Sequence, residues 1–282
     1  MTAQVIQGQK LAEAILDELK LHIDKRNLNE QVGLATILVG FDPASQVYVA
    51  NKRKAARRVG IRSVHYDLPE NTPQEELLNL IAMLNADQRI HGILVQLPLP
   101  QHMQADKIIE SLDPHKDVDG FHPLNLGYLL VGRPRVIACT PLGIMHLIRS
   151  TDYNLFGKHA VVVGRSTIVG KPLAHLLLQA DATVTICHRY TTNLAEITKT
   201  ADVLVVAVGI ARLITKEYIK PGAFVVDVGI NKDEHNRLCG DVDFDAVSQV
   251  ASYITPVPRG VGPLTIAMLL RNTWDNYLRS QS

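Results

Sequence analysis

A tyrosine and a lysine stand four residues apart in a segment with helical spacing. Tyr48 and Lys52 lie on one face of a helix predicted over about 45–59, so their side chains can bracket one ligand. The alternative is a solvated basic helix face, because several further cations follow in the same helix.

Two more polar residues end or follow apolar segments. Gln96 lies at the end of the apolar run 92–97, and ligands of open parallel sheets bind beyond the carboxyl ends of the strands. A simple hydrogen bond from Gln96 to backbone is the alternative. Asp119, in the loop 116–120 (KDVDG), is a carboxylate that can accept N–H groups of a heterocycle. No histidine or further carboxylate completes a ligand set around this loop, so no metal site is predicted.

The stretch 157–178, GKHAVVVGRSTIVGKPLAHLLL, predicts a strand, a glycine turn and a helix. Gly164 permits a tight turn, and the free N–H groups at the start of the next helix suit a phosphate. The match to G-x-G-x-x-G is incomplete, because Ser166 replaces the second glycine and Gly170 comes one residue late. The stretch therefore predicts a nucleotide site.

Cations follow the next predicted strand, 183–187. About 20 residues after the glycine turn, a dinucleotide fold places the group that contacts the adenosine ribose. An acid there would hold a free 2′-hydroxyl, whereas cations suit a 2′-phosphate, so His188, Arg189 and Arg165 favour NADP over NAD. A solvated basic turn is the alternative.

Buried strands alternate with helices along most of the chain, which predicts parallel βαβ units and the α/β class. We expect two α/β domains with a cleft between them, the second a Rossmann-like doubly wound parallel sheet. The predicted domains are 1–139, rejoined by a C-terminal helix 264–282, and 140–263. The predicted strands are 33–40, 61–66, 92–97, 159–163, 183–187, 203–207 and 223–228, and the predicted helices include 9–24, 45–59, 73–84 capped by Thr72, 140–150 and 243–250. The loop 255–263, rich in Pro and Gly, is expected to be irregular.

Composition limits the class of protein. The 282 residues are 46% hydrophobic and 20% charged, and 29 basic against 28 acidic residues leave a net charge of +1, so neither a nucleic-acid nor a membrane surface is predicted. The three cysteines are widely spaced and lack a C-x-x-C pair, which argues against a disulfide framework. With no apolar run of about 20 residues and no leader pattern at the start, a cytoplasmic location is expected.

Six segments together resemble one family over almost the whole chain, the bifunctional methylenetetrahydrofolate dehydrogenase/methenyltetrahydrofolate cyclohydrolases of the FolD type. Arg259 departs from this pattern, because a second glycine is expected there. The six segments are YVANK at 48–52, GILVQLPLP at 92–100, KDVDG at 116–120, GRSTIVGKP at 164–172, DVGIN at 227–231 and TPVPRGVGP at 255–263.

The resemblance implies two reactions on tetrahydrofolate substrates. NADP would oxidise 5,10-methylenetetrahydrofolate to the methenyl cation, and water would convert this cation to 10-formyltetrahydrofolate. Lys52 would be the catalytic lysine of the hydrolytic step, held by Gln96, and Asp119 would bind the pterin. Tyr48 would stack on the folate, which Pro263 would also contact.

The resemblance also implies the cofactor contacts and the assembly. The residues implied for NADP are Gly164, Arg165, Ser166 and Ile230, to which strand-end reasoning adds His188 and Arg189. The family is commonly dimeric, so a homodimer is implied. A dehydrogenase of the amino-acid or shikimate type is the alternative enzyme, but it gives no reason for Lys52, Gln96 and Asp119 together. A binding module without turnover is the other alternative, which the presence of Lys52 opposes.

Overall fold

The computed structural model describes residues 2–281, except the side chain of Ala44. The chain forms two compact units, one of Met1–Ala12 and Thr140–Thr265 and the other of Glu13–Cys139 and Ile266–Ser282. We call them the six-stranded unit and the three-stranded unit after their main sheets. The sequence analysis places the first twelve residues in the domain 1–139. In the structure they belong to the six-stranded unit, because β1 (Gln4–Val5) pairs in parallel with β11 (Tyr253–Ile254).

The main sheet of the six-stranded unit is parallel throughout, with strand order β1-β11-β8-β7-β5-β6. β5 is internal, the chain runs outward to β6 and then crosses back to β7, which is the doubly wound arrangement. The carboxyl ends of β5 and β7 thus form the point where strand order reverses. The remaining strands are β5 (His159–Val163), β6 (Thr183–Cys187), β7 (Val203–Val206) and β8 (Phe224–Asp227).

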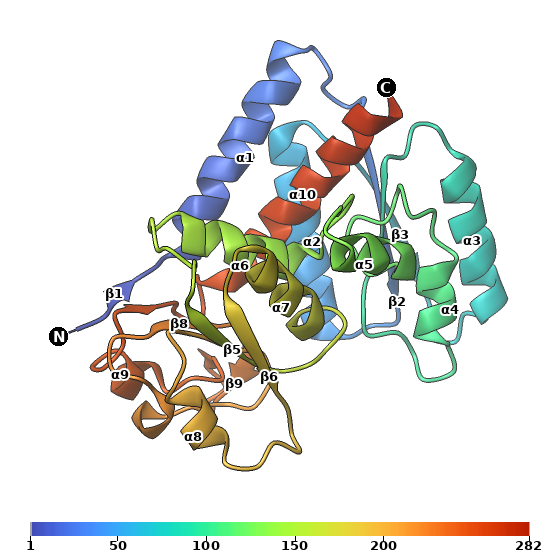
Figure 1. Cartoon of the computed structure of the whole chain (residues 1–282). Coiled ribbons are helices and arrows are strands. Elements are labelled where there is room, and N and C mark those ends of the chain that lie inside the picture. The colour runs from blue at the N-terminus through green and yellow to red at the C-terminus, as the bar shows by residue number, and fades with distance from the viewer. Residues whose placement is uncertain (1, 282) are drawn as a thin grey trace. The chain divides into compact units, whose positions relative to one another are not determined.

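Short helices connect these strands, and α7 (Gly170–Gln179) lies alongside β5 and β6 (Figure 1). β7 and β8 are wholly buried runs, as expected for strands covered on both faces. The other elements are α6 (Cys139–Arg149), α8 (Leu194–Thr198), the 3-10 helix η1 (Lys216–Tyr218), α9 (Phe244–Val247), and the antiparallel pair β9 (Asn231–Lys232) and β10 (Leu238–Cys239).

The three-stranded unit is built on a parallel sheet of order β3-β2-β4. All seven residues of the central strand β2 (Gly33–Val39) are buried. Ala35, Ile37 and Val39 pack with apolar residues of α3 and α4 on one face, and α2 packs against β2 and β3. The other elements are α2 (Pro43–Val59), β3 (Arg62–Leu68), α3 (Gln74–Ala86), β4 (Gly92–Val95), α4 (Ala105–Glu110) and α5 (Pro123–Leu130).

Two helices continue from one unit into the other: α1 (Gly8–Lys25) and α10 (Val261–Ser280). α10 begins within the segment predicted to be irregular, because Pro263 is tolerated in a first helical turn. The N-cap position of α3 is occupied by Pro73, which makes no side-chain capping bond, rather than by the predicted Thr72. α4, α5 and the β9–β10 pair were not predicted, since each of these elements is short.

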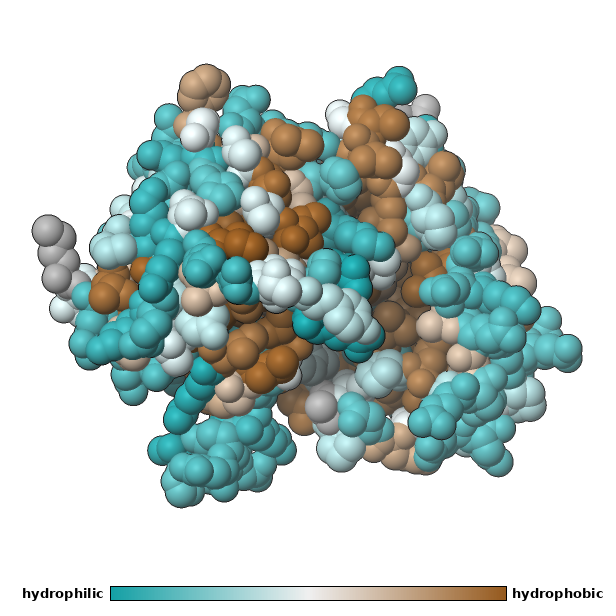
Figure 2. Space-filling model, turned by 60° about the horizontal axis from the view of Figure 1, so that its bottom comes forward, coloured by the Kyte–Doolittle hydropathy of each residue, from teal (hydrophilic) through white to brown (hydrophobic). Residues whose placement is uncertain are grey.

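Hydrophilic residues predominate on the face in Figure 2, where apolar side chains form smaller areas. Exposed apolar residues include Phe41, Leu130 and Phe156. Within the described residues, no helix is long and apolar enough to cross a membrane.

Candidate functional site

Lys52 and Gln96, 44 residues apart, are brought into contact in the three-stranded unit. Lys52 lies in α2, whose first turn is capped by Asp42, and Gln96 directly follows β4. Lys52 Nζ donates to Gln96 Oε1 at 3.0 Å, although the lysine is only 6% exposed. Gln96 Nε2 donates to the backbone oxygen of Leu97 at 2.7 Å, which fixes the orientation of the amide. The buried ammonium is therefore held by a partner that is itself held.

The loop that carries Asp119 is shaped by a buried neighbour. Asp117 accepts hydrogen bonds at 2.9 Å from the backbone N–H groups of Gly120 and His122 and from the side chain of Asn125. Gly120 has φ +74°, and a Cβ there would lie 2.5 Å from the Ala138 nitrogen, so only glycine fits. These contacts fix the backbone of the loop from which the Asp119 side chain extends.

Asp119 and Lys52 interact electrostatically. Burial raises the pKa of Asp119 to about 6, and the charge of Lys52 opposes that rise while the carboxylate of Asp117 adds to it. Part of the Asp119 surface stays accessible, so the carboxylate can still meet a ligand. It is ionised for the most part at pH 7 and returns to the neutral form in mild acid.

Tyr48 lies one helical turn before Lys52 and is half-buried. Burial raises the pKa of its phenol, which therefore stays neutral at physiological pH. A neutral, partly exposed ring offers an aromatic face for stacking and a hydroxyl at its edge.

Two residues near Asp119 were missed by the sequence analysis. Asn272 of α10 donates to the backbone oxygens of Val118 and Ile137, both at 2.9 Å, and so ties the loop to the segment before α6. The thiol of Cys139 donates to Val118 O at 3.1 Å, and burial, followed by the charge of Asp119, raises its pKa. Neither residue has a local sequence signal, because each contacts the loop only through tertiary packing.

The predicted nucleotide turn lies at the carboxyl end of β5. Gly164 has φ +133°, and a Cβ there would collide with the backbone oxygen of Ala207, which follows β7. The N–H groups predicted to be free for a phosphate have acceptors within the turn, because Ser166 Oγ accepts from those of Val169 and Gly170 at 3.2 and 3.4 Å, and Ser166 O accepts from that of Lys171. The turn is thus closely packed at the point where strand order reverses, which is where doubly wound sheets bind nucleotides.

The cations predicted to select NADP gather around an aromatic ring. The guanidinium carbons of Arg189 and Arg165 lie 4.6 and 5.8 Å from the centre of the Tyr190 ring. His188 Nδ1 accepts from the Tyr190 backbone N–H at 3.2 Å. Both arginines are exposed and can therefore reach a phosphate. Tyr190, whose ring both guanidinium groups approach, was not predicted.

Two buried carboxylates support the neighbouring loops. Asp241 accepts from the backbone N–H groups of residues 208, 209 and 210 at 2.7–3.0 Å and from the Asn231 side chain at 2.8 Å. Asp227 accepts from three further N–H groups, and burial raises its pKa to about 7. These bonds fix the segment that presents Ile230, which is exposed.

Pro263 lies in the first turn of α10, in the six-stranded unit, whereas Tyr48, Lys52, Gln96 and Asp119 belong to the three-stranded unit. Its contact with substrate stays a prediction. Among residues 2–281, no group of three or more His, Cys, Asp and Glu side chains could hold a metal ion.

Both halves of the chain match models of known domain families. Residues 6–119 match the tetrahydrofolate dehydrogenase/cyclohydrolase catalytic domain, and residues 138–281 match the tetrahydrofolate dehydrogenase/cyclohydrolase NAD(P)-binding domain. The Bifunctional protein FolD of Geobacillus thermodenitrificans is 55% identical over 276 residues, which cover 98% of this chain and 97% of that protein.

Solved structures agree with these matches. The bifunctional FolD enzyme of Campylobacter jejuni superposes with a TM-score of 0.96 at 49% identity, covering 98% of this chain and 99% of that one. The Trypanosoma brucei FolD, solved in complex with NADP cofactor and an inhibitor, gives a TM-score of 0.95 at 40% identity and covers 100% of this chain and 99% of that one.

Proposed function

This chain belongs to the tetrahydrofolate dehydrogenase/cyclohydrolase family, and we propose that Lys52, Gln96 and Asp119 form the folate site in which its hydrolytic step takes place. The enzyme oxidises 5,10-methylenetetrahydrofolate with NADP to 5,10-methenyltetrahydrofolate and hydrolyses this cation to 10-formyltetrahydrofolate. The observation that supports the site most directly is the 3.0 Å bond between the buried ammonium of Lys52 and Gln96.

Lys52 acts in proton transfer during hydrolysis. Addition of water to the methenyl carbon releases a proton, and opening of the ring delivers one to nitrogen, so a group that can relay protons accelerates this step. A lysine at 6% exposure loses most of its hydration, and the Gln96 oxygen replaces one water as its acceptor. Gln96 is thus a positioning residue for the ammonium as well as a lining residue of the site.

Asp119 and Tyr48 bind the folate. The ionised carboxylate of Asp119 accepts from the paired N–H donors of the reduced pterin, and the Tyr48 ring stacks on the flat ring system. Lys52 and Asp119 interact through their charges, so the residue that binds the pterin also influences the residue that transfers protons.

The dehydrogenase step needs no acid or base from the protein. Loss of hydride leaves a positive charge that two folate nitrogens share, so the protein mainly has to hold the reactants at reactive distance. NADP, when bound, accepts the hydride. Gly164 and Ser166 form the turn at which its phosphates would bind, His188, Arg165 and Arg189 would supply the charge for the 2′-phosphate, and Ile230 would contact the cofactor. The six-stranded unit is therefore the NADP-binding domain, and the three-stranded unit is the catalytic domain.

The test compares Lys52→Met with Lys54→Met, since Lys54 is an exposed lysine on the same helix. We expect Lys52→Met to lower cyclohydrolase kcat by at least about 100-fold and to keep part of the dehydrogenase activity, whereas Lys54→Met keeps both. Equal loss of the two activities in a folded Lys52→Met protein that still binds folate would contradict this separation of roles.

We also propose a homodimer. β6 is an outer strand of its sheet, and Ile186 on that strand and Leu178 at the end of α7 are exposed apolar residues. Such an edge is a template for pairing with a second strand. Sedimentation should give twice the chain mass, and Ile186→Asp should shift it toward the monomer. A wild-type monomer at micromolar concentration would rule the dimer out.

We further propose a cytoplasmic location. All three cysteines are free, and two of them are buried, which suits a reducing compartment. Fractionation of the native cells should recover the dehydrogenase activity with cytoplasmic markers.

A further inference from the structure

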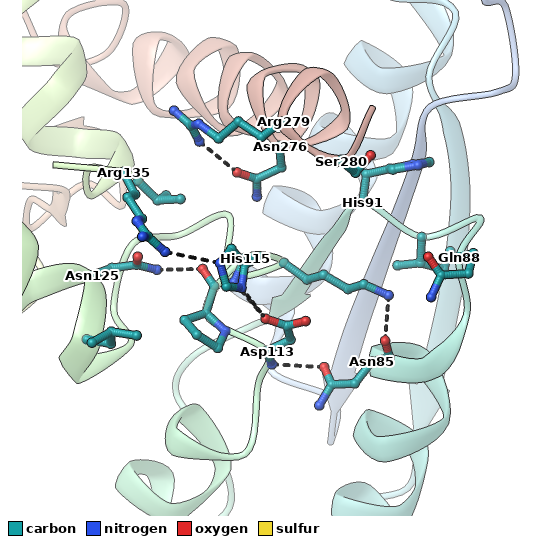
Figure 3. A pocket seen from close by; sticks show the side chains of 15 residues that line it. Asn85, Gln88, His91, Asp113, His115, Asn125, Arg135, Asn276, Arg279 and Ser280 are labelled. Carbon is teal, nitrogen blue, oxygen red and sulfur yellow. Dashed lines mark hydrogen bonds and ion pairs between the residues drawn. The ribbon is translucent and has the colours of Figure 1, made fainter. Parts of the chain in front are cut away.

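The three-stranded unit contains a pocket of about 360 Å³ (Figure 3). None of Tyr48, Lys52, Gln96 and Asp119 lines it. Its walls come from the segment between α3 and β4, from the loop after α4, from the start of α5 and the segment after it, and from the last turns of α10. The lining residues are Asn85, Gln88, Ile90, His91, Asp113, Pro114, His115, Lys116, Leu124, Asn125, Arg135, Val136, Asn276, Arg279 and Ser280.

Positive charge predominates in this pocket. Among the described residues, Lys116, Arg135 and Arg279 line it together with one carboxylate, that of Asp113. Lys116 is fixed in place, because its Nζ donates to three backbone oxygens at the end of α3 at 2.7–3.1 Å. The Asp113 carboxylate accepts from the backbone and ring of His115. Cations thus outnumber carboxylates among the described lining residues.

The two arginines are already oriented. Arg135 has its guanidinium carbon 4.3 Å from the centre of the Tyr128 ring, and its Nη1 donates to His115 Nε2 at 3.1 Å. Arg279 Nη1 donates to Asn276 Oδ1 at 3.1 Å, and both residues extend from α10 (Figure 3). A guanidinium carries five N–H donors, so one such bond leaves Arg135 with a fork that suits the oxygens of a phosphate or carboxylate.

Neutral donors complete the lining. Asn276 is 5% exposed, and its Nδ2 has no hydrogen-bond partner among the described residues. A buried donor without an acceptor is unfavourable, and an acceptor in the pocket would satisfy it after a small rotation of the side chain. His91 Nδ1 accepts from the Gly33 N–H at 3.0 Å, so the ring proton is on Nε2 and the ring offers a donor.

We propose that this pocket is a second binding site, for a small molecule that presents a phosphate or carboxylate group to Arg135 and Arg279 with Asn276 as a neutral donor. The site is separate from Lys52, Gln96 and Asp119. It does not depend on the assignment of the folate site, so either proposal can fail alone.

The test is side-chain amide NMR on the full chain saturated with NADP, so that the cofactor site is filled. Inorganic phosphate and succinate are titrated separately at constant ionic strength. We expect the Asn276 side-chain NH₂ signal to shift saturably with at least one of them, with a Kd on the order of 1 mM or below. Saturation with phosphate alone identifies a phosphate ligand, and saturation with succinate alone identifies a carboxylate ligand.

Arg135→Gln and Arg133→Gln are the matched variants, because Arg133 is an exposed arginine that does not line the pocket. We expect Arg135→Gln to weaken binding by about tenfold or more with unchanged dehydrogenase activity, and Arg133→Gln to bind as the wild type does. No saturable shift of the Asn276 signal with either anion, or equal weakening by the two variants, would overturn the proposal.

Discussion

Asp119 is expected to weaken the fold at neutral pH, and Asp119→Asn should therefore stabilise the protein. Burial raises the pKa of this carboxyl to about 6 from an ordinary value of 3.8. The folded chain thus binds the proton more tightly than the unfolded chain does. Stability from this group is complete below about pH 4 and is lost as the pH rises toward 6 and ionisation proceeds in the folded state.

The size of the effect follows from the two pKa values. A rise from 3.8 to about 6 corresponds to about 3 kcal/mol of unfolding free energy at pH 7, at about 1.4 kcal/mol for each pH unit. At pH 4, close to the pKa in the unfolded chain, the same two pKa values give a loss of only about 0.5 kcal/mol of unfolding free energy. Asn keeps the shape of the side chain and removes the charge, so Asp119→Asn should be more stable than the wild type by up to about 3 kcal/mol at pH 7, and by much less at pH 4.

The assay is urea unfolding followed by the fluorescence of Trp274, the single tryptophan of the chain. It is buried in α10 and belongs to the same unit as Asp119. Asp106→Asn, which changes an exposed carboxylate in α4, is the control and should change stability little at either pH. A stability difference for Asp119→Asn that is absent at pH 7, or equally large at pH 4 and pH 7, would refute the reasoning. The variant should also bind tetrahydrofolate more weakly.

Four further substitutions test the rest of the site. Gln96→Leu removes the acceptor of Lys52 and should lower cyclohydrolase kcat by about tenfold or more in a steady-state assay. Arg189→Ala should reduce the ratio of NADP to NAD kcat/KM by about tenfold, and an unchanged ratio would reject its role. Asp241→Ala leaves four N–H donors without their acceptor and should cost at least about 3 kcal/mol in urea unfolding while raising KM for NADP more than for folate. Arg259 is exposed and has φ +78°, so Arg259→Gly should raise the free energy of unfolding by up to about 1 kcal/mol and leave the affinity for folate unchanged.

The local elements could be predicted because their signals are local. The unbroken apolar run of β2 and the four-residue spacing of α1 are patterns of neighbouring residues, which burial on one or both faces imposes directly. The turn at Gly164 was predicted for the same reason, since a glycine between a β-branched strand and a helix is a local feature. Several such segments, in the order typical of one family, indicated the domain family.

The contacts that give these residues their chemistry depend on tertiary structure. The partner of Lys52 is 44 residues away in sequence, and Asp241 reaches 31 to 33 residues back to hold the loop after β7. The raised pKa of Asp119 comes from the packing of atoms around it, to which no pattern in 116–120 refers. Sequence spacing specifies which side chains share a helix face or a strand end, whereas burial and long-range hydrogen bonds arise only when the sheet and helices pack. The sequence therefore identified the candidate residues, and only the tertiary structure determined their partners and their charge states.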